Sequence, residues 1–317
     1  MASQEFTFRN FTPSQAAAYS RARSSYPPSV IDYVISQHTK SGGGAGVVVD
    51  VGCGPGNATR DLAPHFDMAY GLDPGAGMVA TATAESRDVK TKSGKEVLFR
   101  VCPAEEIDRV EGLEPGTVDL ITAATAAHWF DMPKFWAAAA KALRPGTGTV
   151  AIWTRYISSR EPRTEKEKKY QDIITRFRED FMAAHATPGN AIARGGYVDL
   201  PMPWDEGSHT ASLFERDTYI REEREQSEWE QHSQEKEEKK TTLKDLEELM
   251  ATMSSVNRWR AANPELAGTD KDCVKVLMSQ LQAVLGGNED EEVDIGPLWS
   301  RTAIVVMGVK RTDAAAA

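Results

Sequence analysis

A run of glycines follows an apolar, strand-like segment and could bring the backbone against a ligand. Residues 47–56 read VVVDVGCGPG, so Gly52, Gly54 and Gly56 recur at every second position. Glycine permits positive φ and close approach of a ligand, although a tight strand-to-helix turn explains a lone GxG equally well. The spacing differs from the dinucleotide fingerprint GxGxxG, and Pro55 removes one amide donor. A loop with few donors favours a ligand without phosphates.

Acidic residues follow the next two expected strands. Asp73 comes about twenty positions after Asp50, the distance at which a carboxylate accepts both ribose hydroxyls in dinucleotide sites. An aspartate before a proline, here Pro74, also starts turns. Glu105, which follows Ala104, could face an adenine amino group or cap the next turn. Together with the glycine loop, these positions indicate an adenosine with a positive group and no phosphates, which is S-adenosylmethionine.

The elements that must position these residues alternate between strand and helix. Alternation of this kind predicts a parallel sheet that is covered on both faces. Right-handed crossovers then place the carboxyl ends of the strands along one rim, where ligands of open α/β sheets bind. The expected strands lie near residues 47–51, 68–73, 97–102, 118–123 and 148–153, and the expected helices near 57–65, 77–86 and 131–143.

The flanking regions follow a different pattern. We expect a helix after Pro27 and Pro28, a strand near 209–220, and a last core strand over 301–311 at an antiparallel edge of the sheet. The charged segment 222–240 is typical of a solvated helix or a mobile insertion. Further helices are expected near 161–186, 241–262 and 270–286. The chain divides into a helical lid or prefix (1–46), a cofactor-binding core (47–155), a mostly helical substrate-side region with one core strand (156–300), and the last strand with the tail (301–317).

Composition excludes several classes of function. The net charge is −10 and no long Lys/Arg cluster offsets it, so nucleic acid is not an expected partner. Three cysteines without a CxxC pair argue against a disulfide framework or a zinc site. The first residues lack the apolar run of a signal peptide, and no run approaches the ~18 residues that span a bilayer. We expect a soluble, cytoplasmic protein with a small-molecule substrate; the sequence does not indicate its oligomeric state.

Four segments together resemble class I S-adenosylmethionine-dependent methyltransferases: DVGCGPG, GLDPG, PAEEI and VDLITAATAAHWFDMPKFWAAAAKALRPG. The AHWFD stretch and the prefix YSRARSSYP look specifically like the trans-aconitate methyltransferase group. The later pieces PMPWD and MSSVNRW are similar to the C-terminal half of that group. The core resemblance covers about residues 15–155. Two departures are Ser24, where the family prefix usually has proline, and residues 145–148, where PGTG replaces the usual PGG.

The resemblance implies a Rossmann-like α/β fold, with a seven-stranded, mostly parallel sheet and an antiparallel last strand. We also expect Tyr19, Arg23, Pro74 and Ala124 at the cofactor; arginine binds carboxylates with two prongs, so Arg23 could hold the cofactor's own carboxylate or that of an acidic substrate. The resemblance itself implies cofactor contacts at Asp50, Gly52, Cys53, Gly54, Gly56, Asp73, Met78, Ala104 and Glu105.

Methyl transfer from a sulfonium requires mainly that nucleophile, methyl group and sulfur are aligned. A carboxylate acceptor is already ionised near pH 7 and needs no base, whereas a phenol or alcohol does, for which His128 is the candidate. A structural histidine is an equally good interpretation. Trp129 could pack in the core or stand beside the sulfonium, where cation–π attraction contributes ~0.5–2 kcal/mol. The expected substrate pocket contains Tyr26, Thr125, Trp129, Arg155 and Arg258; Thr125 stands where a larger polar residue is expected.

Three hypotheses follow. The first is O-methylation of a small carboxylate, such as a trans-aconitate-like acid. The second keeps the fold and moves the methyl group to a phenol, amine or carbon of a secondary metabolite. The third is a chain that binds S-adenosylmethionine without transferring its methyl group, as a scaffold or a non-methylating catalyst. The intact glycine loop and Asp73 favour retained cofactor binding.

Overall fold

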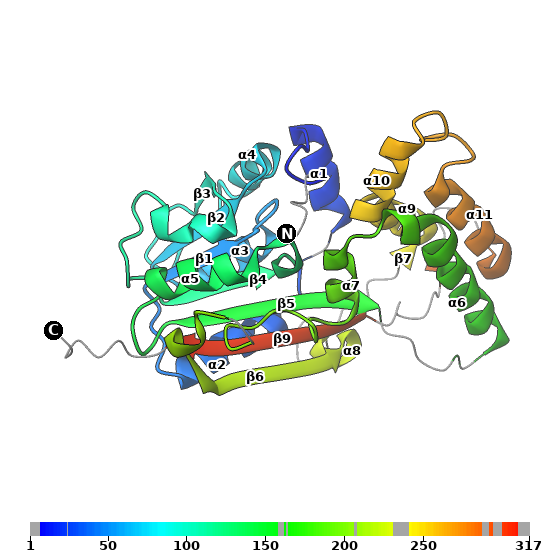
Figure 1. The fold of residues 1–317 in the computed structure, drawn as a ribbon. Helices are drawn as coiled ribbons and strands as arrows, with labels where there is room; N and C mark the ends of the chain where they lie inside the picture. The colour runs from blue at the N-terminus through cyan, green and yellow to red at the C-terminus, as the bar shows by residue number, and fades with distance from the viewer. Residues whose placement is uncertain are drawn as a thin grey trace.

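The computed structural model describes residues 7–23, 25–157, 162, 164–205, 208–230, 241–286, 292–293 and 300–309. Seven strands form one sheet in the order β3-β2-β1-β4-β5-β9-β6, and a two-stranded ribbon joins β7 to β8 (Figure 1). The strands are β1 (Val47–Val51), β2 (Met68–Asp73), β3 (Leu98–Val101), β4 (Leu120–Ala124), β5 (Thr149–Ile157), β6 (Phe214–Glu225), β7 (Thr241–Thr242), β8 (Glu292–Val293) and β9 (Ser300–Val309).

The predicted sheet is confirmed. Strands β1 to β5 pair in parallel, and β9 runs antiparallel to both β5 and β6. The last strand therefore has the predicted direction, but it lies one place in from the edge, which β6 occupies. Buried residues such as Val305 and Met307 suit β9 to this position, because an interior strand is covered on both faces.

Helices cover both faces of the sheet. One face packs against α5 and the short helix Ala104–Arg109 through buried residues such as Phe135 and Trp136. The other face packs against α2, α3 and α8, with Val30 and Trp229 in that core. The helices are α1 (Pro13–Ala22), α2 (Pro28–Lys40), α3 (Asn57–Leu62), α4 (Ala76–Glu85), α5 (Met132–Ala142), α6 (Glu165–Phe177), α7 (Pro188–Arg194), α8 (Gln226–Glu230), α9 (Leu243–Ala251), α10 (Ser254–Ala262) and α11 (Cys273–Leu285).

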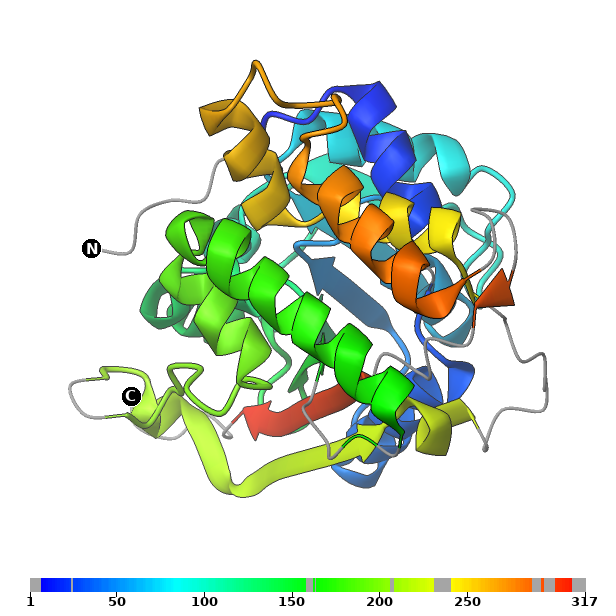
Figure 2. The same cartoon turned by 90° about the vertical axis from the view of Figure 1, so that its right-hand side faces the viewer.

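A second core lies outside the sheet. Helices α6, α9, α10 and α11 share buried side chains that include Tyr170, Leu246, Trp259 and Leu277. Figures 1 and 2 show these helices gathered beyond the end of the sheet toward which β5 points. Because the parallel strands end on this side, the helical cluster covers the rim at which the site was predicted.

Three local predictions are corrected. The strand expected over 209–220 lies at Phe214–Glu225, and residues 222–225 of the charged segment belong to it. Alternating charges suit β6 because it is an edge strand with partly exposed side chains; residues 226–230 form α8, and 231–240 lie outside the described residues. The helix expected over 241–262 is broken at Thr252–Met253 into α9 and α10. The helix expected over 161–186 begins at Glu165 and continues after Phe177 as a π-helical turn, Arg178–Met182, and a 3₁₀ turn, Ala183–His185.

Candidate active site

The glycine loop joins β1 to α3 at the rim of the sheet. Gly52, Gly54 and Gly56 have φ of +63°, +54° and +85°, a region that side chains rarely adopt. A Cβ on Gly52 would lie 2.5 Å from the Cβ of Ala126, and one on Gly56 would touch Phe99 at 3.0 Å. A Cβ on Gly54 would meet no atom within 4 Å. Two glycines are therefore required by packing, whereas Gly54 borders open space.

Asp73 ends β2 beside this loop and is 8% exposed. Its Oδ2 accepts from the Gly54 amide at 3.0 Å and its Oδ1 from the Gly75 amide at 2.7 Å. Burial raises the pKa of Asp73, and these two amides, with the charge of Arg9, oppose that shift. The carboxylate is therefore held by backbone donors next to the open side of Gly54, where its remaining lone pairs could accept ribose hydroxyls.

Asp50 lies beneath the loop and is 1% exposed. Its two oxygens accept from the hydroxyls of Thr59 at 2.7 Å and Thr122 at 2.8 Å. Burial raises the pKa of this carboxyl to about 6, and the two threonine hydroxyls oppose the shift. Asp50 thus ties β1 to β4 and α3 and supports the loop from below. The structure shows no open side of this carboxylate for a direct cofactor contact.

The remaining predicted cofactor residues surround the same rim. Cys53 and Met78 are buried, and the Cys53 amide bonds the carbonyl of Leu72. Ala104 is buried at the start of a short helix, and Glu105 Oε1 accepts from the Asp131 amide at 2.7 Å. That bond favours the interpretation of Glu105 as a cap, with its second oxygen left for a ligand. Ala124 and Pro74, at the ends of β4 and β2, are half-buried.

The N-terminal prefix packs over this rim, as expected. The carbonyl of Phe11 lies so close to α4 that a Cβ on Gly77 would be 2.1 Å away. Phe8 makes edge-on ring contacts with Tyr19 and with Trp129, whose centroids are 5.5 and 6.1 Å away. These contacts bring the prefix, α4 and the segment after β4 to one place.

Arg23 and Arg155 lie close enough to interact electrostatically. Arg23 ends α1; its Nε donates to Thr252 at 2.9 Å, and its carbonyl accepts from Asn57, directly after the glycine loop. Arg155 lies near the end of β5 and donates through Nη2 to the carbonyl of Ser25 at 3.2 Å. Burial lowers the pKa of Arg155, and the charge of Arg23 adds to the shift. Two cations therefore share one partly buried space.

Arg155 is incompletely satisfied. Its Nε is buried without a hydrogen-bond partner, and no ion pair to it is found among the described residues. The guanidinium lies over the ring of Tyr26 at 5.2 Å. The charge of Glu230 opposes the lowering of the Arg155 pKa, but no carboxylate forms an ion pair with this guanidinium among the described residues. A buried cation that is not directly paired is costly, so this corner of the site is suited to an anion.

Tyr26 and Thr125 meet beneath Arg155. Their hydroxyl oxygens are 2.6 Å apart. Thr125 follows β4 with φ of +54°, and its amide bonds the carbonyl of Trp153 at 2.7 Å. A β-branched residue in the left-handed region is an outlier that costs about 1–3 kcal/mol and concentrates at functional sites.

His128 and Trp129 follow in a short helix, Ala127–Trp129. His128 Nδ1 lies 2.8 Å from the hydroxyl oxygen of Tyr197, which the sequence had not singled out. Burial lowers the pKa of His128 to about 3, and the charge of Arg23 adds to the shift. His128 is therefore a neutral imidazole at pH 7 and a weak base.

Comparison with known proteins relates the residues around this site to a described family. Residues 49–152, which run from β1 into β5, match the family described as a Methyltransferase domain. Over these residues, about a third of the chain, the protein is similar to methyltransferase domains. A "Probable S-adenosylmethionine-dependent methyltransferase CRG1" of Saccharomyces cerevisiae is 30% identical over 139 residues, 44% of this chain and 45% of that protein. Methyltransferase ptaI of Pestalotiopsis fici is 32% identical over 160 residues, 49% of this chain and 46% of ptaI.

The alignments to these two relatives thus cover less than half of either protein. A solved structure assigned as a type II methyltransferase of Anaeromyxobacter dehalogenans has the same fold, with a TM-score of 0.56 and 22% identity over 91% of this chain and 97% of that one. The domain and the assignment of CRG1 support S-adenosylmethionine as the cofactor of this site. A trans-aconitate-specific likeness is not among these matches.

Arg258 lies outside the matched residues 49–152 and makes its own set of hydrogen bonds. Its Nε donates to the carbonyl of His185 at 2.7 Å, and its Nη2 to Asn190 at 2.6 Å. Its Nη1 reaches Thr7 at 3.3 Å. With these donors used, we regard Arg258 as a clamp between α10, α7 and the prefix, not as an anion-binding residue.

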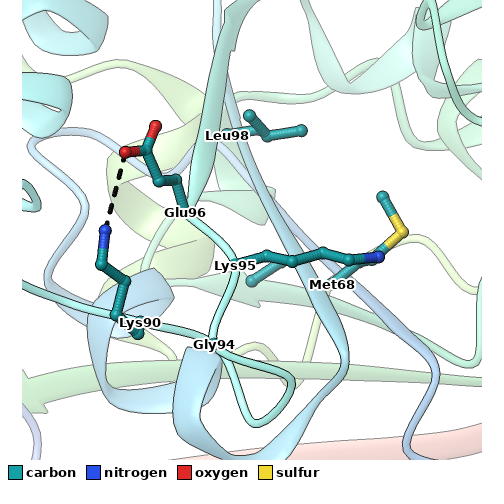
Figure 3. A pocket seen from close by; sticks show the side chains of 7 residues that line it. Met68, Lys90, Gly94, Lys95, Glu96 and Leu98 are labelled. Carbon is teal, nitrogen blue, oxygen red and sulfur yellow. Dashed lines mark ion pairs between the residues drawn. The ribbon is translucent and has the colours of Figure 1, made fainter.

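Two hollows on the surface of the described residues are lined by no residue of the glycine loop 52–56. One of about 440 Å³ lies at the amino ends of β2 and β3 and is lined by Met68, Lys90 and Lys95, among others (Figure 3). Its position at the opposite rim, with a Lys90–Glu96 ion pair at 3.6 Å, gives it no group suited to the chemistry of the methyltransferase domain. A smaller one of about 250 Å³ adjoins Arg23 and Asn57.

The described residues contain neither a candidate metal cluster nor a candidate membrane-spanning helix. No group of three or more His, Cys, Asp and Glu side chains is arranged to hold a metal ion within these ranges. No helix in the same part of the chain combines the length and the apolar character needed to cross a bilayer.

Replacing Asp73 by alanine should weaken S-adenosylmethionine binding by roughly 1–3 kcal/mol, because one to two hydrogen bonds to the cofactor are lost. Isothermal titration calorimetry measures this directly. Asp119→Ala is the matched control: Asp119 is also buried and accepts from a backbone amide, that of Val47, but at the opposite rim. Unchanged affinity in Asp73→Ala would remove Asp73 from the site.

Replacing Asp50 by asparagine should change how stability depends on pH. The pKa of about 6 that Asp50 has in the folded protein exceeds the ordinary aspartate value of 3.8. From about pH 4 to 6 the folded protein keeps a proton that the unfolded chain loses, so stability falls as pH rises through this window. Relative to Asp50→Asn, the wild type should lose roughly 3 kcal/mol between pH 4 and pH 7. Urea unfolding at several pH values checks this; parallel curves would contradict the buried, raised carboxyl.

Proposed function

We propose that this chain is an S-adenosylmethionine-dependent methyltransferase that O-methylates a small carboxylic acid. The observation that carries the proposal is Arg155, a largely buried guanidinium with an unpaired Nε at the end of β5. An acidic acceptor would supply the negative charge that this group lacks. Arginine suits the task because its planar fork binds carboxylates with two hydrogen bonds.

The residues of the loop fit the cofactor. Gly54 leaves open space beside it, and Asp73 presents a carboxylate for the ribose. Arg23, held next to the loop through Asn57, is suited to the cofactor's own carboxylate. Positioning of the two reactants by these contacts is the main contribution that the protein makes to such a reaction.

The protonation state of His128 helps to distinguish between the possible types of methyl acceptor. When bound, S-adenosylmethionine supplies a methyl group on positively charged sulfur, which a carboxylate oxygen accepts while the sulfur keeps the bonding electron pair. No proton has to be removed from an ionised acid, whereas a phenol or alcohol requires a base. The pKa of His128, lowered to about 3, makes it a weak base, which supports the carboxylate.

The test is incubation of the full chain with methyl-labelled S-adenosylmethionine and a panel of di- and tricarboxylic acids, with phenols and amines alongside. Label that mild base releases as methanol identifies an ester and is the expected result. Base-stable label on a phenol, amine or carbon would replace the proposal with the second hypothesis. Cofactor binding without any labelled product would support a non-methylating role.

A further inference from the structure

Tyr197 and His128 form a buried pair between α7 and the segment after β4. Tyr197 is 3% exposed, and its oxygen lies 2.8 Å from His128 Nδ1. The two side chains come from positions 69 residues apart. Helix α7 also packs directly on this segment, because a Cβ on Gly189 would lie 2.4 Å from the His128 carbonyl oxygen.

The backbone that carries Tyr197 is strongly fixed. Gly196 and Tyr197 both have φ of +63°. A Cβ on Gly196 would come within 2.7 Å of the Tyr156 ring, and the Gly196 carbonyl accepts from Arg221 at 2.7 Å. A bulky residue in the left-handed region persists only where its surroundings impose it. The turn therefore aims the phenol at His128 at a cost in backbone strain.

The acceptors available to the phenol decide the direction of the hydrogen bond. The Tyr197 hydroxyl is buried, and among the described residues its only hydrogen-bond partner is His128 Nδ1. A buried O–H needs an acceptor, so the phenol donates its proton to Nδ1. Burial raises the pKa of Tyr197, so the phenol keeps that proton; burial and Arg23 lower the pKa of His128, so the imidazole is neutral. A neutral imidazole that accepts at Nδ1 carries its proton on Nε2.

We propose that Tyr197 is a positioning residue that holds His128 in the tautomer with its proton on Nε2, from which His128 donates a hydrogen bond to the acceptor carboxylate. The second half rests on the proposed function. Among the described residues Nε2 has no hydrogen-bond partner, and it is not one of the buried unpaired atoms. It is therefore free to meet a ligand.

A neutral donor suits a carboxylate that is to be methylated. The negative charge of this carboxylate disappears as the ester forms, so a cation paired with it would stabilise the substrate more than the transition state. A neutral N–H can instead bind the carboxylate oxygen that does not attack and so orient the oxygen that does. Because this donor carries no charge, it stabilises the substrate over the transition state less than a cation would. Arg155 would then hold a different anionic group of the acceptor.

The first test is a spectroscopic measurement on the free protein. Long-range ¹H–¹⁵N correlation spectra of histidine-labelled chain distinguish the two neutral tautomers and the charged form, and His128→Gln assigns the signal among six histidines. The expected result is neutral His128 with its proton on Nε2 at pH 7. A proton on Nδ1, or a charged ring, would overturn the proposal. In Tyr197→Phe we expect a mixture of tautomers; an unchanged spectrum would remove Tyr197 from the role.

The second test is kinetic and uses an acid that the wild type methylates. Tyr197→Phe should lower kcat about 3- to 10-fold, the effect of one hydrogen bond, with unchanged cofactor affinity by calorimetry. His128→Gln, which retains an N–H donor, should keep more activity than His128→Ala. Tyr70→Phe is the matched control, since Tyr70 is also buried and its hydroxyl also makes one hydrogen bond, to the carbonyl of Gly112, away from the site.

The outcomes separate the two proposals. If no acid is methylated, the proposed function fails, while the tautomer measurement still decides the role of Tyr197. If acids are methylated and the tautomer is as expected, but His128→Ala keeps full kcat, the hydrogen bond to the acceptor is overturned. Equal kinetic losses in Tyr197→Phe and Tyr70→Phe would indicate a general packing effect and contradict the positioning role.

Discussion

Replacing Gly54 by leucine should abolish measurable S-adenosylmethionine binding, with a loss of affinity of at least about 100-fold, while the protein stays folded. The side chain would project into the open space beside Gly54, where nothing lies within 4 Å of a Cβ. That space is where the cofactor must approach the backbone, since glycine loops serve this purpose. Calorimetric titration with the cofactor measures the loss, and thermal unfolding checks the fold.

Gly94→Leu provides a matched control. Gly94 also has a left-handed φ, +79°, and a Cβ there would likewise meet no atom within 4 Å. Both variants should lose about 1–2 kcal/mol of stability from backbone strain. Only Gly54→Leu should lose the cofactor. Equal cofactor affinity in the two variants would show that the ligand does not approach the loop at Gly54.

Replacing Arg155 by glutamine should raise KM for the acidic acceptor roughly 100-fold and leave the cofactor's Kd unchanged. A two-pronged contact with a carboxylate contains two charge-assisted hydrogen bonds, each of which contributes about 1.5–3 kcal/mol. Arg155→Lys should recover part of the loss, since lysine keeps the charge without the planar fork. Steady-state kinetics over a range of acceptor concentrations provides the measurement.

The stability of Arg155 variants distinguishes a role of Arg155 in binding the acceptor from a role in holding the fold. Because Arg155 is largely buried with an unpaired Nε and no direct ion pair among the described residues, Arg155→Met should unfold at the same or a higher denaturant concentration than the wild type. Arg100→Gln, on the exposed face of β3, serves as the control for loss of one positive charge. A marked loss of stability in Arg155→Met with unaltered KM would mean that Arg155 holds the fold and not the acceptor.

The core of the fold was predictable because its signals are local. Strands β1 and β2 are short apolar runs that end at a glycine or at an aspartate before a proline, and both lie at their expected positions. Strand β5 begins within a residue of its expected start but extends to Ile157. The position of strand β6 was predicted wrongly because charged residues fill its second half, 221–225. It is an edge strand, and polar side chains are tolerated on both faces of such a strand. A pattern of charges cannot distinguish such a strand from a solvated helix.

For the site, the sequence by itself determined the loop, the acidic rim and the class of cofactor. Those residues act through backbone conformation and through their place at strand ends. Both features follow from residues that are neighbours in the sequence. The tertiary structure alone decided which arginine has an unpaired donor, since the Arg155 Nε has no hydrogen-bond partner, whereas Arg258 donates to the carbonyl of His185, to Asn190 in α7 and to Thr7 in the prefix. It also brought Tyr197 to His128 and enclosed Asp50 between two threonines. Hydrogen-bond satisfaction and burial depend on residues distant in the chain, so no local pattern records them.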